Sequence, residues 1–224
     1  MNPWVILKAL FLREIKLALH RRANILTLGY FYIMIATLFA VSMNGDAKAL
    51  QSIAPSALWV SALFAIMLSL NHLFTDDFTD KTIEQLLLAP APLSMLVAIK
   101  IFVQWLTSAF PLILATPFLG IQFGMGAAEI GSLLTSLLLG TPTLTLIGAI
   151  GAALTLGTKG SSILIAVLIF PLYIPTLIFG SSAANATLFG HSAEEALVML
   201  AALLIIGIIT IPYAVAVSLR IALE

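Results

Sequence analysis

Six long apolar runs limit the fold of this sequence more than any other feature. They cover residues 24–43, 54–73, 95–119, 130–156, 161–181 and 197–219. A helix that crosses a bilayer needs about 20 mainly apolar residues, because lipid offers no hydrogen-bond partners and a helix satisfies its own backbone. Each run is long enough for one crossing. We therefore predict an all-α integral membrane protein, with six transmembrane helices in a single domain over residues 1–224.

Composition supports a membrane protein and excludes several other classes. Hydrophobic residues make up 61% of the chain and charged residues 9%, against about 45–50% and about 25% in soluble domains. The formal net charge is zero and no basic block lies beyond the N-terminal region, so we expect no nucleic-acid partner. The chain has no cysteine, which excludes disulfides and thiolate metal sites. The first run is longer than the apolar core of a signal peptide, about 7–15 residues, so we expect it to remain as a span.

Lysine and arginine predict the orientation, because short cytoplasmic loops carry an excess of them. If the N-terminus is cytoplasmic, that side holds Lys8, Arg13, Lys16, Arg21, Arg22, Lys81, Lys159 and Arg220, with Lys100 close enough to reach back to it. Only Lys48 faces outward. We therefore expect both termini in the cytoplasm and the loops near 44–53, 120–129 and 182–196 outside.

Residues 3–22 predict an N-terminal helix that lies in the membrane interface instead of crossing it. Trp4, Phe11, Ile15 and Leu19 fall along one side, and Arg13, Lys16 and His20 fall opposite. An amphipathic basic helix of this kind lies in the plane of the headgroups. It is either a simple positive-inside anchor or an element linked to gating.

Small residues and histidines provide the remaining candidate sites within and beside the spans. Gly148 and Ala152, and likewise Ala149 and Ala153, are four residues apart, which favours close helix packing over a substrate contact. The histidines His20, His72 and His191 sit at expected membrane edges without partners spaced for a metal. Only His191 is expected outside.

No motif indicates an enzyme. GTKGSS at 157–162 has the residue types of a phosphate-binding loop in the wrong order, and no HExxH or GxSxG motif occurs. If ATP drives this protein, a partner subunit must bind it.

The segment 74–92, FTDDFTDKTIEQLLLAPAP, gathers five charges between two apolar runs. Each charge would cost about 2.5–3.5 kcal/mol at the middle of the bilayer, so the segment must lie in water, on the cytoplasmic side. We expect Asp80 to cap a two-turn helix that Pro90 and Pro92 end. So short a helix is marginal unless its apolar side docks on something, which suggests a partner protein with an apolar groove and a basic rim. The alternative is a solvated loop.

Four segments then resemble a known family. They are IAPSALWVSALFAIMLSL, LFTDDFTDKTIEQLLLAPAPL, LLLGTPTLTLIGAIGAALTLG and FPLYIPTLIFG. They are similar to segments of the haem exporter protein B (CcmB) family, the ABC-2 type permease of cytochrome c maturation, in the expected order along nearly the whole chain. The family usually has glycine where this chain has Ser56 and Lys81, often an acidic–basic pair where it has Asn71 and His72, and a more basic loop where it has only Lys159.

The resemblance implies an ATP-driven complex in the inner membrane. Two copies of the permease would pair with two copies of the cytoplasmic ATPase CcmA, together with the haem-handling protein CcmC, the one-span subunit CcmD and the outward-facing haem chaperone CcmE. CcmA would bind ATP and the complex would handle haem. We expect this chain to bind no cofactor directly, because Met34, Met67, Tyr173 and Tyr213 form no convergent pair of haem ligands.

The function implied is to couple ATP hydrolysis to haem delivery and to release of the haem-loaded chaperone on the periplasmic side. The ATPase is expected to push on residues 76–87. The residues expected to carry that contact are Asp76, Asp77, Asp80, Glu84 and Gln85 as polar groups and Ile83, Leu86 and Leu87 as a buried anchor. Alternatives are a direct haem exporter, an ABC-2 permease for another substrate, and a structural membrane scaffold.

Overall fold

The structure, a computed structural model, describes residues 3–156 and 161–222 and contains no strand within them. The all-α prediction is confirmed. The elements in chain order are α1 (Pro3–His20), α2 (Arg22–Ser42), α3 (Ala47–Ser69), the 3₁₀ turn η1 (Leu70–His72), α4 (Thr75–Thr79), α5 (Thr82–Leu87), α6 (Leu93–Gln122), α7 (Ala127–Leu154), α8 (Ser161–Ala186) and α9 (Glu194–Ala222).

Five helical stretches in the described part of the chain are long and apolar enough to cross a membrane. They are α2, the stretch Ala47–Thr79 that begins with α3, and then α6, α7 and α9. These stretches contain all or nearly all of five of the six predicted runs. The other run, 161–181, falls in α8, where the side chains of residues 161–166 lie outside the described part.

The second predicted run differs most from the helix that contains it. We expected residues 54–73, but α3 begins at Ala47 and ends at Ser69, where the chain tightens into η1. The early start has a local cause, because the Asp46 side chain accepts hydrogen bonds from the backbone N–H groups of Lys48 and Ala49, at 3.0 and 3.2 Å. Such a cap satisfies donors that the first helical turn leaves free. The apolar pattern did not reveal this early start of α3, because the residues that follow Asp46 are partly polar.

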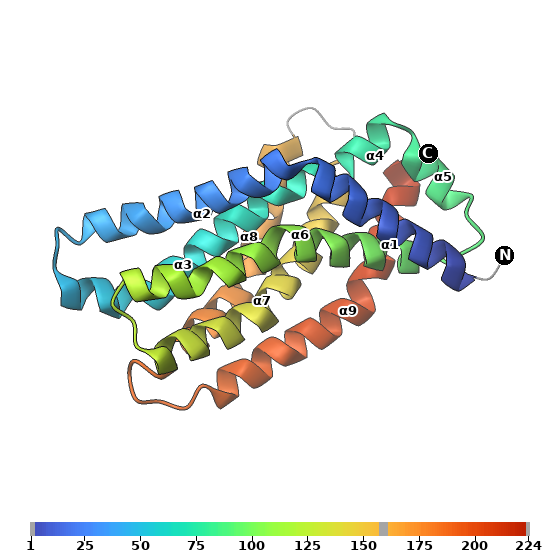
Figure 1. Cartoon of the computed structure of the whole chain (residues 1–224). Coiled ribbons are helices and arrows are strands. Elements are labelled where there is room, and N and C mark those ends of the chain that lie inside the picture. Colours follow the sequence, from blue (N-terminus) through green and yellow to red (C-terminus); the bar gives the residue numbers. More distant parts are fainter. Residues whose placement is uncertain (1–2, 157–160, 223–224) are drawn as a thin grey trace.

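The long helices run alternately between two ends of one bundle (Figure 1). The α2–α3, α6–α7 and α8–α9 connections lie at one end, which we call the loop end. α1, α4, α5 and the last turns of α9 lie at the other, the charged end. The expected alternation of the chain between two membrane faces matches this path.

A tryptophan packed against two glycines joins three helices of the core. Trp59 of α3 is fully buried, and its indole Nε1 donates a hydrogen bond of 2.8 Å to Ser136 Oγ of α7. A Cβ atom added at Gly140 of α7 would lie 2.2 Å from Trp59 Cη2, and one at Gly180 of α8 would lie 2.3 Å from Trp59 Cζ2. Only glycine leaves room for the ring at these positions, so the two glycines let α7 and α8 approach α3 closely.

α1 is not among the candidate spans in the described part of the chain, and it packs against α6 at the charged end. Leu10 is buried in this contact, and Phe11 stacks on Phe102 with ring centroids 6.5 Å apart. The predicted apolar stripe is divided, because Phe11 and Ile15 are partly buried while Trp4 and Leu19 are exposed. The exposed side of α1 therefore mixes large apolar residues with lysines, as a helix at a membrane interface does.

Candidate functional site

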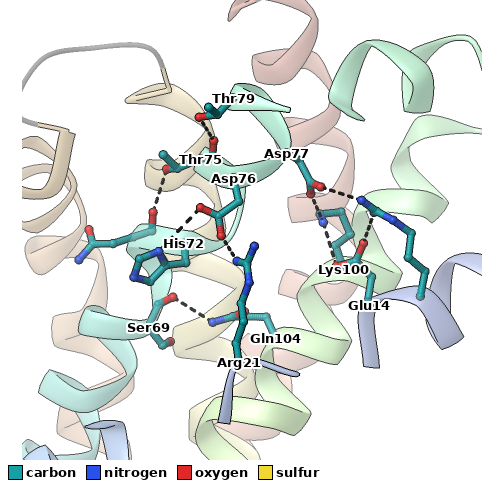
Figure 2. Close-up of polar contacts among 12 residues, drawn as sticks. Glu14, Arg21, Ser69, His72, Thr75, Asp76, Asp77, Thr79, Lys100 and Gln104 are labelled. Atoms are coloured by element: carbon teal, nitrogen blue, oxygen red, sulfur yellow. Dashed lines mark hydrogen bonds and ion pairs between the residues drawn. The ribbon is translucent and has the colours of Figure 1, made fainter. Parts of the chain in front are cut away.

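A cluster of charged side chains lies at the charged end, where α1, α4 and α6 meet (Figure 2). It consists of Arg13, Glu14, Asp77 and Lys100. Lys100 Nζ lies 3.1 Å from Glu14 Oε2 and also pairs with the Asp77 carboxylate. The Arg13 guanidinium completes the ring, at 2.8 Å from Glu14 and 3.3 Å from Asp77. We call these four residues the charged cluster.

The charged cluster is largely withdrawn from water. The Lys100 side chain is 4% exposed, and the side chains of Asp77 and Glu14 are only slightly more exposed. Charges in such a position persist only when they are paired, because each loses its hydration. Two acids and two bases make the cluster formally neutral. Through Lys100, the cluster ties α1 and α4 to α6.

From the sequence, we expected three of these four residues in a different setting, with Arg13 on the polar side of an interfacial helix. We expected Lys100 to reach cytoplasmic water, but its ammonium group ends on two carboxylates. We expected Asp77 to contact a partner protein, but it is buried against Lys100 and Arg13. Glu14 was missed. A signal was available, since Glu14 is the only acidic residue before Asp46 and Lys100 is the only base within its apolar run.

A more exposed set of polar contacts lies beside the charged cluster. Asp76 pairs with Arg21, and the His72 ring nitrogen Nδ1 lies 4.0 Å from the Asp76 carboxylate. Gln104 Nε2 donates a hydrogen bond of 3.0 Å to the backbone oxygen of Ser69, joining α6 to the end of α3. A cavity of about 260 Å³ opens between these contacts and the charged cluster. Both expected coupling residues at 76 and 77 are thus engaged within the chain.

The short helix that we predicted forms as α5, but the prediction that Asp80 caps it is wrong. Asp80 ends α4, where its backbone N–H bonds to Asp76 O, and does not cap α5. Lys81 precedes α5 with φ 57° and ψ 19°, and no side-chain cap bond is present. This left-handed conformation favours glycine. Lysine thus occupies a backbone position in this turn that favours glycine.

The apolar side of α5 docks on the chain itself. Ile83 is buried in the core, and Leu86 and Leu87 are partly buried against it. We expected these three residues to anchor α5 in a partner. The polar side faces outward among the described residues, since Glu84 and Gln85 are exposed, and Leu88, directly after α5, is 86% exposed. α5 is therefore held from within and presents two polar groups and one leucine outward.

The four small residues of α7 lie inside the bundle. Gly148, Ala149, Ala152 and Ala153 are all buried. A Cβ atom at Gly148 would lie 2.1 Å from Leu70 Cδ1 and 2.6 Å from the Tyr173 hydroxyl. The surroundings of Gly148 thus come from η1 and α8 of the same chain.

The fold defines an all-α, multi-pass integral membrane protein, with buried charges gathered at one end of its helix bundle. Residues 5–222 match the model of the family described as CcmB protein. The chain therefore belongs to the CcmB family. It is similar to proteins named heme exporter protein B, with 42% identity to that of Pseudomonas aeruginosa, 39% to that of Haemophilus influenzae and 38% to that of Paracoccus denitrificans. These alignments cover 95–97% of this chain and 96–100% of the relatives.

Proposed function

We propose that this chain is the membrane subunit of an ATP-driven complex for cytochrome c maturation, in the bacterial inner membrane with both termini cytoplasmic. CcmA would hydrolyse ATP at the charged end. CcmC, CcmD and a second copy of this chain would complete the membrane part, and the haem chaperone CcmE would be loaded and released at the loop end. The names of the relatives support a role in haem transport.

One observation carries the proposed coupling, namely the two-sided environment of α5. Its inner side is fixed by buried Ile83, and its outer side exposes Glu84, Gln85 and Leu88. A helix this short holds its shape only through docking, and it already docks on its own chain. Its outer side is therefore available for a partner at no cost to the fold.

The contacts around α5 give a route for force. A push on α5 would act on the core through Ile83, and on α4, which precedes it in the chain. α4 is tied to α6 and α1 through Asp77 in the charged cluster. An ATPase can drive such a movement only if its two nucleotide states contact α5 differently.

The test is co-purification of the full chain with CcmA after changing the outer side of α5. Glu84→Lys and Leu88→Glu each remove a contact that we place in the interface, so the yield of bound CcmA should fall on the order of tenfold, as for a central interface residue. ATP hydrolysis and release of haem-loaded CcmE should fall with it.

The matched control is Glu194→Lys. Glu194 is also an exposed acid in the first turn of a helix, but it lies at the loop end. We expect it to leave CcmA binding unchanged. If Glu84→Lys and Leu88→Glu behave like Glu194→Lys, the ATPase does not use α5. A chain that retains CcmA but supports no haem-dependent release would instead be a permease for another substrate.

A further inference from the structure

A second polar and apolar site lies at the loop end, far from the charged cluster. It is a groove between α3, the last turns of α8 and the start of α9, with a volume of about 1000 Å³. This is the upper end of the range for small-molecule and cofactor pockets, about 300–1,000 Å³. We call it the outer groove.

The outer groove has apolar walls and several polar groups, which include Glu195 and one hydrogen-bonded polar patch. Ile53, Leu177 and Phe189 are among the apolar residues that line it. The polar patch is Ser56, Ser181 and Asn185, in which Asn185 Nδ2 donates hydrogen bonds of 2.8 Å to Ser56 Oγ and to the backbone oxygen of Ser181. A flat, mainly apolar ligand with a polar edge fits such a lining.

His191 lines the same groove and is exposed. Its backbone N–H donates a hydrogen bond of 2.8 Å to Ala186 O, which fixes the residue to the end of α8. No hydrogen bond or ion pair within the described residues engages its imidazole ring. The backbone of His191 is therefore held beside the groove, and neither ring nitrogen has a partner among the described residues.

A bare metal ion does not suit this place. The described residues contain no group of three His, Cys, Asp or Glu side chains able to hold one. Haem differs, because the porphyrin supplies four nitrogen ligands and the protein needs to supply only an axial one, for which histidine is a usual choice.

We propose that the outer groove binds haem, with His191 as the axial ligand of the iron. The proposal rests on the haem-transport role proposed above and gives that role a site on this chain. It departs from our expectation that the chain binds no cofactor directly, because that expectation considered only ligands within the spans. A single protein ligand suits a cargo, since only one iron–nitrogen bond must break when the haem is handed on. The site lies at the end where the haem chaperone would be loaded.

The test uses the full-length chain purified into lipid nanodiscs and titrated with ferric haem. Absorbance and electron paramagnetic resonance should show an imidazole-ligated iron. His191→Ala should weaken binding on the order of tenfold or more and remove the imidazole signature, and added free imidazole should restore that signature. Ser182→Trp, at an exposed position in the groove lining, should reduce binding by filling the space while leaving His191 in place.

The matched control is His20→Ala, which removes an exposed histidine at the charged end and should change nothing. Equal affinity and equal spectra for wild type, His191→Ala and Ser182→Trp would overturn the proposal, because the haem would then be dissolved in the lipid. Absence of haem binding by wild type would overturn it too. The two proposals can fail separately. If Glu84→Lys still weakens CcmA binding, either of these results leaves the proposed coupling through α5 standing. If Glu84→Lys does not weaken CcmA binding, haem binding that depends on His191 would still support the outer groove as a haem site.

Discussion

Replacing Lys100 by methionine tests whether the charged cluster holds α1 and α4 onto the bundle. Methionine has nearly the length of lysine but no charge, so the change removes the cation and little of the packing. Asp77 and Glu14 would then lie near each other in a site that is largely withdrawn from water. We expect α1 to open from the bundle far more often.

The size of the effect follows from burial. Removing one partner of a buried ion pair costs about 3–5 kcal/mol, because the other charge stays buried without compensation. Arg13 remains next to both acids, at 2.8 and 3.3 Å, but its side chain is 40% exposed and compensates only in part. We therefore expect the lower end, about 3 kcal/mol. Each 1.4 kcal/mol is a factor of ten, so the opening equilibrium should rise on the order of a hundredfold.

Hydrogen exchange by mass spectrometry in detergent measures this opening directly, through the backbone amides of α1. Arg21→Met is the matched control. It breaks the ion pair with Asp76. The side chain of Arg21 is 47% exposed and that of Asp76 is 34% exposed, and ion pairs this exposed contribute about 0–1 kcal/mol to stability. Lys100→Met combined with Asp77→Asn leaves Glu14 with Arg13 and should recover much of the loss. If Lys100→Met opens α1 no more than Arg21→Met does, the cluster does not hold α1, and the reasoning from burial is refuted.

Two further changes test packing and backbone conformation. Gly148→Ala would bring a Cβ atom within 2.1 Å of Leu70, and overpacking of this kind costs about 1–3 kcal/mol, so the thermal unfolding midpoint in detergent should fall. Gly131→Ala, where nothing lies within 4 Å of the added atom, should leave it unchanged or raise it. Lys81→Gly should relieve the left-handed backbone and slow amide exchange in α5, with a gain of up to about 1 kcal/mol. Asn44→Gly, at φ 51°, should gain less because asparagine tolerates this conformation; equal gains would contradict the explanation.

The helices were predictable from the sequence because their signal is local. A run of about 20 apolar residues indicates a spanning helix wherever it occurs, and proline and charge marked the segment that forms α4 and α5. The ends were less predictable. α3 begins as early as Ala47 because the Asp46 side chain caps its first turn. The polar residues that follow such a cap are not counted as part of an apolar run.

The site was less predictable because its residues are distant in sequence. Glu14 and Asp77 are separated by 63 positions, and only the packing of α1 against α6 brings both to Lys100. Charge alone suggested that Asp76 and Asp77 faced a partner. In the structure Asp77 pairs with Lys100 and Arg13, and Asp76 pairs with Arg21. Glu84 is exposed, and none of the ion pairs among the described residues involves it, so it is the better candidate for an external contact.

α3 connects the two ends of the bundle and therefore the two proposed sites. Ser56 and Trp59, in the middle of α3, line the outer groove, and η1 continues α3 directly into α4 and α5. Trp59 fills the space above Gly140 and Gly180, so α3 cannot slide along α7 and α8 without moving the indole. A push on α5 that shifts α3 would consequently change the lining of the outer groove, which is the differential contact that coupling between two sites requires.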